Sequence, residues 1–562
     1  MAKANEFEAI VIGSGISGGW AAKELCEKGL KTLVIERGRK LDHVGGYTTA
    51  ATPPWEFKHH GKITQEDREE YPIQSQVYAF NEGTRHLWVK DTEYPYTSTA
   101  EGPEYRWIRG YHQGGRSIMW GRQCYRWSDL DFEANVRDGI EIDWPIRYQD
   151  IAPWYSYVEK FIGVSGQAEG IPHLPDGEFL PPYEMNCVET HVKQAIESKF
   201  SNRRMTIGRV ANLTVPHNGR GQCQRRNLCY RGCPYGAYFS SQSSTLPAAQ
   251  KTGNLTLLTD TVAAQLIYDK SAGKISGVRV LNTQSGAEEV YSASLIFLCA
   301  STLNSAWLLL NSATEEFPDG LANSSGALGR YLMDHQYRAG AMASFEGFED
   351  RYYFGGRPNG IYIPRFRNVD DKHPDFIRGY GYQGSAQRSG PERGESMPGV
   401  GIDFQKNLTK PGPWTMRIGG FGEVLPYRDN FVTLNHNKLD VNGLPTLDIH
   451  CKHRDNEKVM REDFKNQAAE MLEAAGGLDV RIYDDVDYPG FGIHEMGTAR
   501  MGHDPRSSVL NKWNQSHDIA NLFITDGSCM TSASCVNPSI TYMALTARAV
   551  DYAVAQLKKM NI

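Results

Sequence analysis

Three glycines near the start of the chain have the spacing of a phosphate-binding turn. Gly13, Gly15 and Gly18 form a G-x-G-x-x-G motif between an apolar run and a helical pattern. The first glycine allows a tight turn, the second lets the backbone approach a pyrophosphate, and the third lets the helix pack closely on its strand. Glu36 ends the next strand pattern, where an acid accepts hydrogen bonds from a ribose hydroxyl. The motif predicts a bound dinucleotide; a glycine-rich turn of an unrelated α/β protein is the alternative.

The glycine motif alone does not separate FAD from NAD. The chain continues for hundreds of residues beyond it. That length favours FAD, a cofactor held along its whole length by distant segments.

Three cysteines lie close together in a glycine- and arginine-rich segment. Cys223, Cys229 and Cys233 have the spacing C-x5-C-x3-C-P, and the other seven of the ten cysteines are scattered. Thiolates at short spacing bind zinc or iron–sulfur clusters, and a proline after the last cysteine also occurs in ferredoxins. A zinc site needs a fourth ligand, for which His217 is the nearby candidate. These residues alone do not decide whether the cysteines bind an iron–sulfur cluster, a zinc ion or no metal.

The composition is that of a large globular protein. The 562 residues are 40% hydrophobic and 22% charged, with a net charge of −6 and no basic stripe, which argues against nucleic acid as a partner. The longest apolar-leaning run, 295–310, is too short and too polar to cross a bilayer. The N-terminal residues enter a strand pattern at once and lack the features of a signal peptide, so we expect any export to depend on another protein.

The segments around these motifs are of two kinds. A strand at 7–12, a helix and a second strand form a βαβ unit, with further strands at 254–267 and 275–298. Residues 340–450 have short alternating runs rich in Tyr, Phe and Gly, which predict a mostly antiparallel sheet. Helices are expected within 147–166 and at 188–200, 301–313, 455–475 and the end of the chain. The pattern predicts an α/β cofactor domain joined to a domain with an antiparallel sheet.

Segments from both ends of the chain together resemble a known family. They are IVIGSGISGGWAAKELCEKGLKTLVIERG, GGRSIMWGR, HEMGTARMG and LFITDGSCMTSASCVNPSITYMALTARA, with a degenerate second signature at 300–312. Over nearly the full length they are similar to the glucose–methanol–choline (GMC) flavoprotein oxidoreductases. This resemblance implies a discontinuous Rossmann-type FAD domain (1–165, 205–335 and 486–562) and a substrate domain with an antiparallel sheet (166–204 and 336–485).

The resemblance also implies the catalytic residues. Oxidation of an alcohol by flavin removes a hydroxyl proton and a hydride from carbon, and a neutral His near its reference pKa of about 6.5 can take the proton. The family places such a His at the start of the HxMGTxRMG segment, here His494, and its His or Asn companion in the VNPS loop, here Asn537. A core histidine and a plain helix cap are the alternative roles. Further FAD contacts are implied at Ser17, Gly114, Gly115, Ser117, Val262, Asp526, Asn537, Pro538 and Ser539.

Met119 departs from the pattern of some sugar-oxidising relatives. Those relatives attach FAD covalently through a His in a Thr-His-Trp segment, and the corresponding run here is Ile118-Met119-Trp120. Methionine cannot form that bond. FAD is therefore expected to be non-covalent.

The cysteine spacing resembles that of multi-subunit bacterial GMC sugar dehydrogenases, whose catalytic subunits carry a three-iron (3Fe-4S) cluster on three cysteines. This favours a dehydrogenase over an oxidase. The runs ERGRK, RGCPYGAYFSSQSS, CASTLNSAWLLLNS and GRYLMDH are most like glucoside 3-dehydrogenases, which convert glucosides and disaccharides to 3-keto sugars. Gluconate, sorbitol, fructose and glucose dehydrogenases and sugar 3-oxidases are close alternatives. Such relatives travel folded with a small signal-bearing subunit, which implies a periplasmic enzyme with a cytochrome-type or other acceptor; a cytoplasmic enzyme is the alternative.

Two features of the presumed substrate domain have two interpretations each. Glu423 is a candidate site residue or a buried structural carboxylate. The aromatic residues of 352–382 either stack on the apolar faces of a sugar or form an ordinary sheet core. They are Tyr352, Tyr353, Phe354, Tyr362, Phe366, Phe376, Tyr380 and Tyr382.

Overall fold

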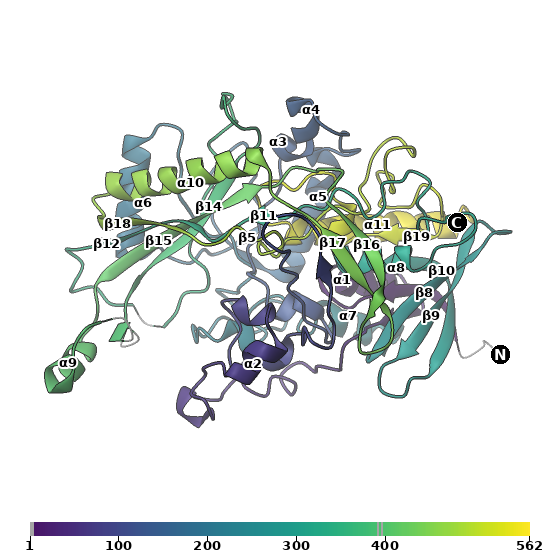
Figure 1. The fold of residues 1–562 in the computed structure, drawn as a ribbon, viewed down its shortest axis with the longest axis horizontal. Coiled ribbons are helices and arrows are strands. Elements are labelled where there is room, and N and C mark those ends of the chain that lie inside the picture. The colour runs from purple at the N-terminus through teal and green to yellow at the C-terminus, as the bar shows by residue number, and fades with distance from the viewer. Residues whose placement is uncertain (1–4, 354, 391–392, 395–396) are drawn as a thin grey trace.

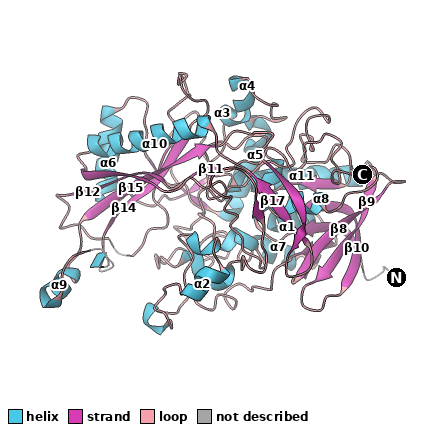
Figure 2. Cartoon of the chain, viewed as in Figure 1, coloured by secondary structure: helices cyan, strands magenta, loops and turns pink. Residues whose placement is uncertain are grey.

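The structure is a computed structural model of the chain and describes residues 5–353, 355–390, 393–394 and 397–562 (Figure 1). Its strands gather into two large sheets, one at each end of the molecule, with helices packed around them (Figure 2).

The first sheet has seven strands and is built around the N-terminal strand. β1 (Glu6–Ile12) pairs in parallel with β2 (Thr32–Ile35) on one side and with β10 (Glu288–Leu298) on the other. β7 (Leu255–Leu258) pairs in parallel with β2, and β19 (Leu522–Ile524) with β10. The inner strands are apolar runs buried on both faces, which is typical of parallel strands covered by helices on each side. The predicted βαβ unit is confirmed.

Helices cover both faces of this sheet. α1 (Ile16–Glu27) packs against α7 (Thr245–Lys251) and α11 (Ser539–Lys558), and α11 also packs against α5 (Tyr148–Ile162). α8 (Thr302–Leu310) packs on the opposite side, where it buries its apolar residues with Ile10 and Ile12 of β1. The first sheet and these helices form the α/β part of the predicted fold class.

Two expected strands are each divided in the structure. The segment 254–267 holds the parallel strand β7 and the start of β8 (Thr261–Asp269), because Asp260 at φ +53° turns the chain between them. The segment 275–298 holds most of β9 (Lys274–Asn282) and all of β10, joined through a turn with Gly286 at φ +70°. The prediction of one strand for each segment is therefore wrong: polar residues interrupt the apolar pattern at 259–261 and at 282–286, where the chain turns.

The second sheet is antiparallel, as predicted. Its strands, in spatial order, are β18 (Leu478–Asp484), β12 (Ala339–Phe345), β15 (Trp414–Glu423), β14 (Tyr380–Arg388), β13 (Ile361–Ile363) and β6 (Thr206–Ile207); β11 (His335–Gln336) also pairs with β15. Helices α10 (Asp455–Ala474) and α6 (Cys187–Lys199) cover one face and bury their apolar sides there. Gly420 allows α10 to lie close, because a Cβ at this position would stand 2.5 Å from the Phe464 ring.

Strand alternation gives the second sheet a core face and a cavity face. On β14, Tyr380 and Tyr382 are buried beneath the helices, whereas Gln383 and Ser385 line a cavity. Successive side chains of a strand point to opposite faces. The sheet therefore presents polar side chains to the space between it and the first sheet.

The segment 340–450 also contains elements that leave the second sheet. β16 (Phe431–Leu439) and β17 (Pro445–His450) form a separate three-stranded sheet with β3 (Thr97–Ser98), and α9 (Gly401–Leu408) projects from the body of the molecule (Figure 1). A single antiparallel sheet over 340–450 is therefore too simple a prediction. The remaining elements are β4 (Val164–Ser165), β5 (Phe179–Leu180), α2 (Gln65–Glu70), α3 (Asp129–Phe132), α4 (Ala134–Asp138) and 3-10 turns at Pro54–Glu56, Gln74–Gln76, Arg85–Leu87, Gly115–Ile118, Cys229–Arg231 and Gly527–Cys529.

In the part of the chain that the structure describes, no helix combines the length and apolar character needed to cross a bilayer. The boundaries proposed above for the two domains remain a prediction.

Candidate active site

A cavity of about 1190 Å³ is lined by residues of both large sheets and of the loops between them. This volume exceeds the roughly 300–1,000 Å³ of most small-molecule pockets. It leaves room for a large cofactor together with a second molecule.

The glycine turn forms one end of the cavity and is built as the motif predicts. Gly13 has φ +95°, a conformation that favours glycine. A Cβ on Gly18 would stand 1.8 Å from the Gly13 carbonyl oxygen, whereas a Cβ on Gly15 would meet no atom within 4 Å. Gly15 therefore faces open space, where a phosphate can approach the backbone.

Glu36 lines the cavity beside this turn and also braces it. Its carboxylate accepts hydrogen bonds from the Ser14 N–H (3.1 Å), the Ser14 hydroxyl (2.6 Å) and the Gly38 N–H (2.8 Å). Burial raises its pKa above the ordinary carboxyl value, and these donors oppose that shift. Oε2 accepts both bonds from Ser14, whereas Oε1 accepts only the Gly38 N–H and keeps a second acceptor site to which a ribose hydroxyl can donate.

Most of the predicted cofactor residues line the cavity. They are Gly13, Gly15, Ser17, Glu36, Gly115, Ser117, Val262, Asp526, Asn537 and Ser539. Gly18, Gly114 and Pro538 support its walls instead. Gly114 has φ +81° and donates its N–H to the Ser14 hydroxyl (2.7 Å), and Pro538 caps the N-terminus of α11.

The cavity fits a negatively charged, elongated dinucleotide. The N-termini of α1 and α11 both open onto it, and helix N-termini favour negative charge. The Tyr542 hydroxyl is buried at its wall and has no hydrogen-bond partner among the described residues. Asp526 accepts from the Ser305 and Ser528 hydroxyls, each at 2.5 Å, and is thereby held at the cavity edge.

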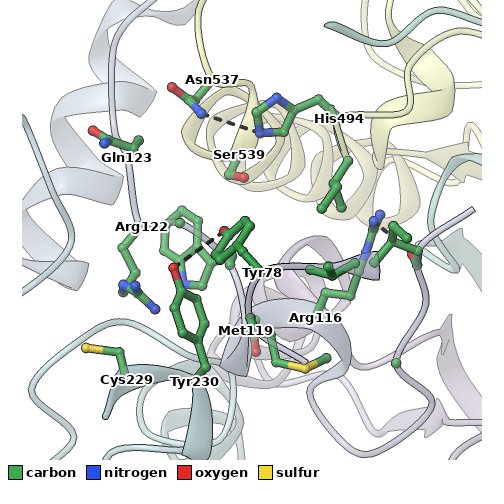
Figure 3. Close-up of a pocket in the computed structure, with 18 of the residues that line it drawn as sticks. Tyr78, Arg116, Met119, Arg122, Gln123, Cys229, Tyr230, His494, Asn537 and Ser539 are labelled. Carbon is green, nitrogen blue, oxygen red and sulfur yellow. Dashed lines mark hydrogen bonds between the residues drawn. The ribbon is translucent and has the colours of Figure 1, made fainter. Parts of the chain in front are cut away.

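His494 and Asn537 lie together in the same cavity (Figure 3). His494 Nε2 and Asn537 Nδ2 are 3.4 Å apart. Asn537 Oδ1 accepts a hydrogen bond of 2.5 Å from Gln383 Nε2 of β14. The structure thus brings together two residues from distant loops.

The backbone at His494 is held by Asp334. One oxygen of the Asp334 carboxylate accepts the N–H of His494 and the other the N–H of Gly492, each at 2.8 Å. Ile493, between these donors, has φ +62°, an outlier for a β-branched residue. Such a strained conformation persists only where the surrounding structure fixes it. Here Asp334 fixes it by accepting the N–H groups on both sides of Ile493.

His335 holds the His494 ring. The two Nδ1 atoms are 2.9 Å apart, and His335 Nε2 lies 2.8 Å from the Ser534 carbonyl oxygen. Burial lowers the pKa of His335 to about 4 and that of His494 well below the ordinary value of 6.5; His335 and Arg116 also lower the latter. Both rings are therefore neutral at pH 7.

The chain matches the "GMC oxidoreductase" model over residues 10–337 and 426–546. It is a GMC oxidoreductase. It is 29% identical to 2-methyl-1,2-propanediol dehydrogenase of Mycolicibacterium austroafricanum, covering 98% of this chain and 95% of that one. It is 26% identical to the fructose dehydrogenase large subunit of Gluconobacter japonicus, covering 98% of both chains. Pyridoxine 4-oxidase from Mesorbium loti shares its fold with a TM-score of 0.59 at 16% identity, over 98% of this chain and 99% of that one.

The family assignment confirms the resemblance and the fold class inferred from the sequence, and FAD is the cofactor that the family supports. The site of this GMC oxidoreductase also contains residues that the sequence analysis did not assign. Arg116 and Glu495 form a bidentate ion pair (2.6 and 3.1 Å) at the cavity wall. Asp334 and His335 contact His494, and Gln383 contacts Asn537. The run GRYLMDH, which ends at Asp334 and His335, was the available signal for two of them.

The aromatic segment of this GMC oxidoreductase is mostly core. Tyr362, Phe366, Phe376, Tyr380 and Tyr382 are buried in the two main hydrophobic clusters. Tyr352 and Tyr353 do line the cavity, and Phe354 lies outside the described residues. Of the two interpretations of these aromatic residues, an ordinary sheet core therefore holds for the five buried rings.

Glu423 is a structural carboxylate. It is 1% exposed, lies 3.3 Å from Arg378 Nε and does not line the cavity. Burial raises its pKa to about 7, and Arg378 opposes that shift.

The three clustered cysteines line a second, small cavity, and Cys229 lines the large one as well (Figure 3). All ten cysteines are free thiols. Within the described residues, however, no three His, Cys, Asp or Glu side chains are arranged to hold a metal ion. The candidate zinc ligand His217 is bound elsewhere, through Nε2 to the Lys160 carbonyl oxygen (2.8 Å).

Proposed function

We propose that this GMC oxidoreductase is an FAD-dependent dehydrogenase that oxidises a secondary alcohol of a sugar, converting the C3 hydroxyl of a glucoside or disaccharide to a 3-keto group. The observation that carries the chemical part is the position of His494 Nε2 and Asn537 Nδ2, 3.4 Å apart, in the same cavity as the dinucleotide turn. Bound FAD supplies the hydride acceptor.

In this proposal His494 is the general base. A substrate hydroxyl that replaces the direct contact between the two side chains accepts a hydrogen bond from Asn537 Nδ2 and donates its proton to His494 Nε2. General-base catalysis of this kind contributes about 10²- to 10⁴-fold to rate. Neutral His494 suits the task, because its lowered pKa leaves Nε2 free to take a proton at pH 7.

Polar side chains around the pair support a polyol or sugar substrate. Gln123, Gln383, Ser385, Gln387 and Asn359 line the cavity from several elements. They offer both donors and acceptors, as sugar hydroxyls require. Relatives named for fructose, for gluconate and for an aminoglycoside (6'''-hydroxyparomomycin C oxidase of Streptomyces lividus, 27% identical) agree with this class.

The choice of C3 rests on the resemblance to glucoside 3-dehydrogenases. A panel of methyl glucoside, a disaccharide, glucose, gluconate, sorbitol and fructose, with an artificial acceptor and products assigned by NMR, tests it. A 3-keto glucoside supports the proposal. Activity confined to gluconate, fructose or a sugar alcohol refutes it in favour of the alternative dehydrogenases, and direct reduction of oxygen at full rate favours a sugar 3-oxidase.

FAD is proposed to be non-covalent. Met119 lines the cavity where some relatives carry a linking histidine, and a thioether cannot form that link. Acid precipitation of the holoenzyme is the test. Flavin released to the supernatant supports the proposal, and flavin retained in the pellet refutes it.

The proposal that Cys223, Cys229 and Cys233 bind a 3Fe-4S cluster rests on ligand chemistry. The three free thiols share one small cavity, and the Arg225 N–H donates to Cys223 Sγ (3.4 Å). The side chains as placed do not form a metal site, so the oxidation proposed above does not depend on one. Iron and acid-labile sulfide in anaerobically purified protein would support the cluster; zinc without sulfide, or neither, would refute it.

We further propose a small signal-bearing partner subunit, periplasmic location and a cytochrome-type or other external acceptor. The support is the resemblance, together with the relative named as a large subunit. Fractionation and co-purification from the native host test this. A stable partner in the periplasmic fraction is expected, and cytoplasmic activity without a partner would refute it.

A further inference from the structure

We propose that His335 and Gln383 are positioning residues that fix the protonation pattern of the catalytic pair, so that the unprotonated Nε2 of His494 faces the substrate. The inference deepens the proposed function and rests on His494 as the base. It concerns one hydrogen-bond chain, Ser534–His335–His494–Asn537–Gln383.

The first end of the chain assigns the tautomer of His335. Its Nε2 lies 2.8 Å from the Ser534 carbonyl oxygen and 3.3 Å from that of Ala533. Carbonyl oxygens only accept, so Nε2 carries the hydrogen. The ring is 1% exposed and burial lowers its pKa to about 4, so it is neutral and its Nδ1 is an acceptor.

His335 then determines the tautomer of His494. Their Nδ1 atoms are 2.9 Å apart, which requires one hydrogen between them. Because His335 Nδ1 is bare, the hydrogen belongs to His494 Nδ1. A neutral His494 therefore has its lone pair on Nε2, the atom that lies beside Asn537 in the cavity.

The second end of the chain agrees with this direction. Gln383 Nε2 lies 2.5 Å from Asn537 Oδ1, and this contact turns the Asn537 Nδ2 hydrogens toward His494 Nε2. Nδ2 only donates, so it also requires an acceptor at that nitrogen. Both ends of the hydrogen-bond chain therefore assign His494 Nε2 as the proton acceptor.

The alternative tautomer of His494 conflicts with both neighbours. It would place two bare nitrogens 2.9 Å apart at His335 and two donors face to face at Asn537. Leaving a buried polar group unpaired is unfavourable, so this tautomer is disfavoured at both contacts. The charged and titratable groups around His494 are Arg116 and Glu495 at the cavity wall, Asp334 on its backbone and His335 on its ring.

His335 is separable from substrate binding. It starts β11, packs edge-on to Phe421 of β15 and does not line the cavity, whereas Gln383 does. A variant that removes only the His335 acceptor should therefore reduce kcat with little effect on KM.

The test compares two substitutions of His335 in the FAD-loaded enzyme. His335→Leu removes the acceptor, and kcat is expected to fall by about 10- to 10³-fold with KM within about threefold. His335→Asn places Oδ1 near the former Nδ1 and is expected to recover about tenfold of the loss, the value of one restored buried hydrogen bond. Flavin content and melting temperature are measured for each variant.

His191, at an exposed site, offers a control for the loss of a histidine that contacts a backbone carbonyl. Its Nε2 also donates to a backbone carbonyl, that of Ala475 (2.8 Å), and its ring packs edge-on to Phe345 and Phe348, away from the cavity. His191→Leu is expected to leave kcat unchanged.

Gln383→Glu provides a test that is independent of His335. A carboxylate accepts but does not donate, so the Asn537 amide turns its Nδ2 toward the carboxylate and its Oδ1 toward His494 Nε2. That arrangement favours protonated His494, and the carboxylate charge acts in the same direction. The acidic limb of the kcat/KM profile is expected to move up by about one pH unit or more.

The outcomes separate this inference from the function on which it rests. Wild-type kcat in His335→Leu, no recovery in His335→Asn, or an unmoved acidic limb in Gln383→Glu each overturns the positioning role. If the His494→Ala variant turns over normally, His494 is not the base. The proposed function then fails, and His335 and Gln383 have no catalytic base to position.

Discussion

The Nδ1 atoms of His335 and His494 lie 2.9 Å apart although 159 positions separate them in the chain. His335 starts β11 and pairs with Glu423 of the second sheet, whereas His494 lies in the loop that returns to β19 of the first. His494 lines the cavity that also holds the dinucleotide turn, and His335 lies behind it, outside the cavity lining. In the proposed mechanism, proton transfer depends on that contact.

The activity should persist to lower pH than an ordinary histidine base allows. Burial lowers the pKa of His494, so its neutral form is present above that lowered value. We expect kcat/KM to be flat from about pH 8 to pH 6 and to fall only at more acidic pH, where an unshifted histidine would already be half protonated at about 6.5. A profile with constant flavin content checks this, and an acidic limb near 6.5 would contradict it.

Asp334→Asn should impair both stability and turnover. The carboxylate accepts two N–H groups that flank the strained Ile493, and an amide has one oxygen to offer. Losing one buried bond should lower the free energy of unfolding by about 1–3 kcal/mol and kcat by about tenfold, because the His494 backbone is released.

Asp518→Asn is the control for this prediction. Asp518 accepts hydrogen bonds from the N–H (3.1 Å) and from the hydroxyl of Ser324, at an exposed site. The control should change neither property. Equal behaviour of the two variants would show that Asp334 has no special role.

Two glycines of the same turn should respond differently to alanine. A Cβ on Gly18 would collide with the Gly13 carbonyl at 1.8 Å, so Gly18→Ala should lower the melting temperature even without FAD. A Cβ on Gly15 meets no protein atom, so Gly15→Ala should leave the apoprotein unchanged and weaken only FAD binding.

Thermal melts of apoprotein and flavin titrations of both variants make the comparison. If Gly15→Ala binds FAD normally, a phosphate does not approach the backbone there, and the assigned cofactor orientation is wrong.

Local sequence signals predicted much of this fold. The G-x-G-x-x-G turn, the acid at Glu36 and the apolar run of β1 are contiguous, and each has a direct physical reason to be where it is. The antiparallel character of the second sheet also follows from alternation. The breaks at Asp260 and Gly286 were not predicted, although polar residues at 259–261 and 282–286 separate the strand patterns on either side of each turn.

Residues that act through tertiary contacts were harder to predict. His494 and Asn537 came from resemblance, and no spacing rule links either of them to His335 or Gln383. The aromatic segment was ambiguous because stacking on a sugar and packing in a core require the same side chains. Because alternate residues of β14 face α10, Tyr380 and Tyr382 are buried in the core.

The central claim is that His494 takes the proton of a sugar hydroxyl beside FAD. Anaerobic mixing of the FAD-loaded enzyme with the preferred sugar of the substrate panel, followed by the loss of oxidised-flavin absorbance, measures this half-reaction directly. For His494→Ala with wild-type flavin content, flavin reduction is expected to be slower by about 10²- to 10⁴-fold. Flavin reduction at the wild-type rate in that variant would contradict the claim.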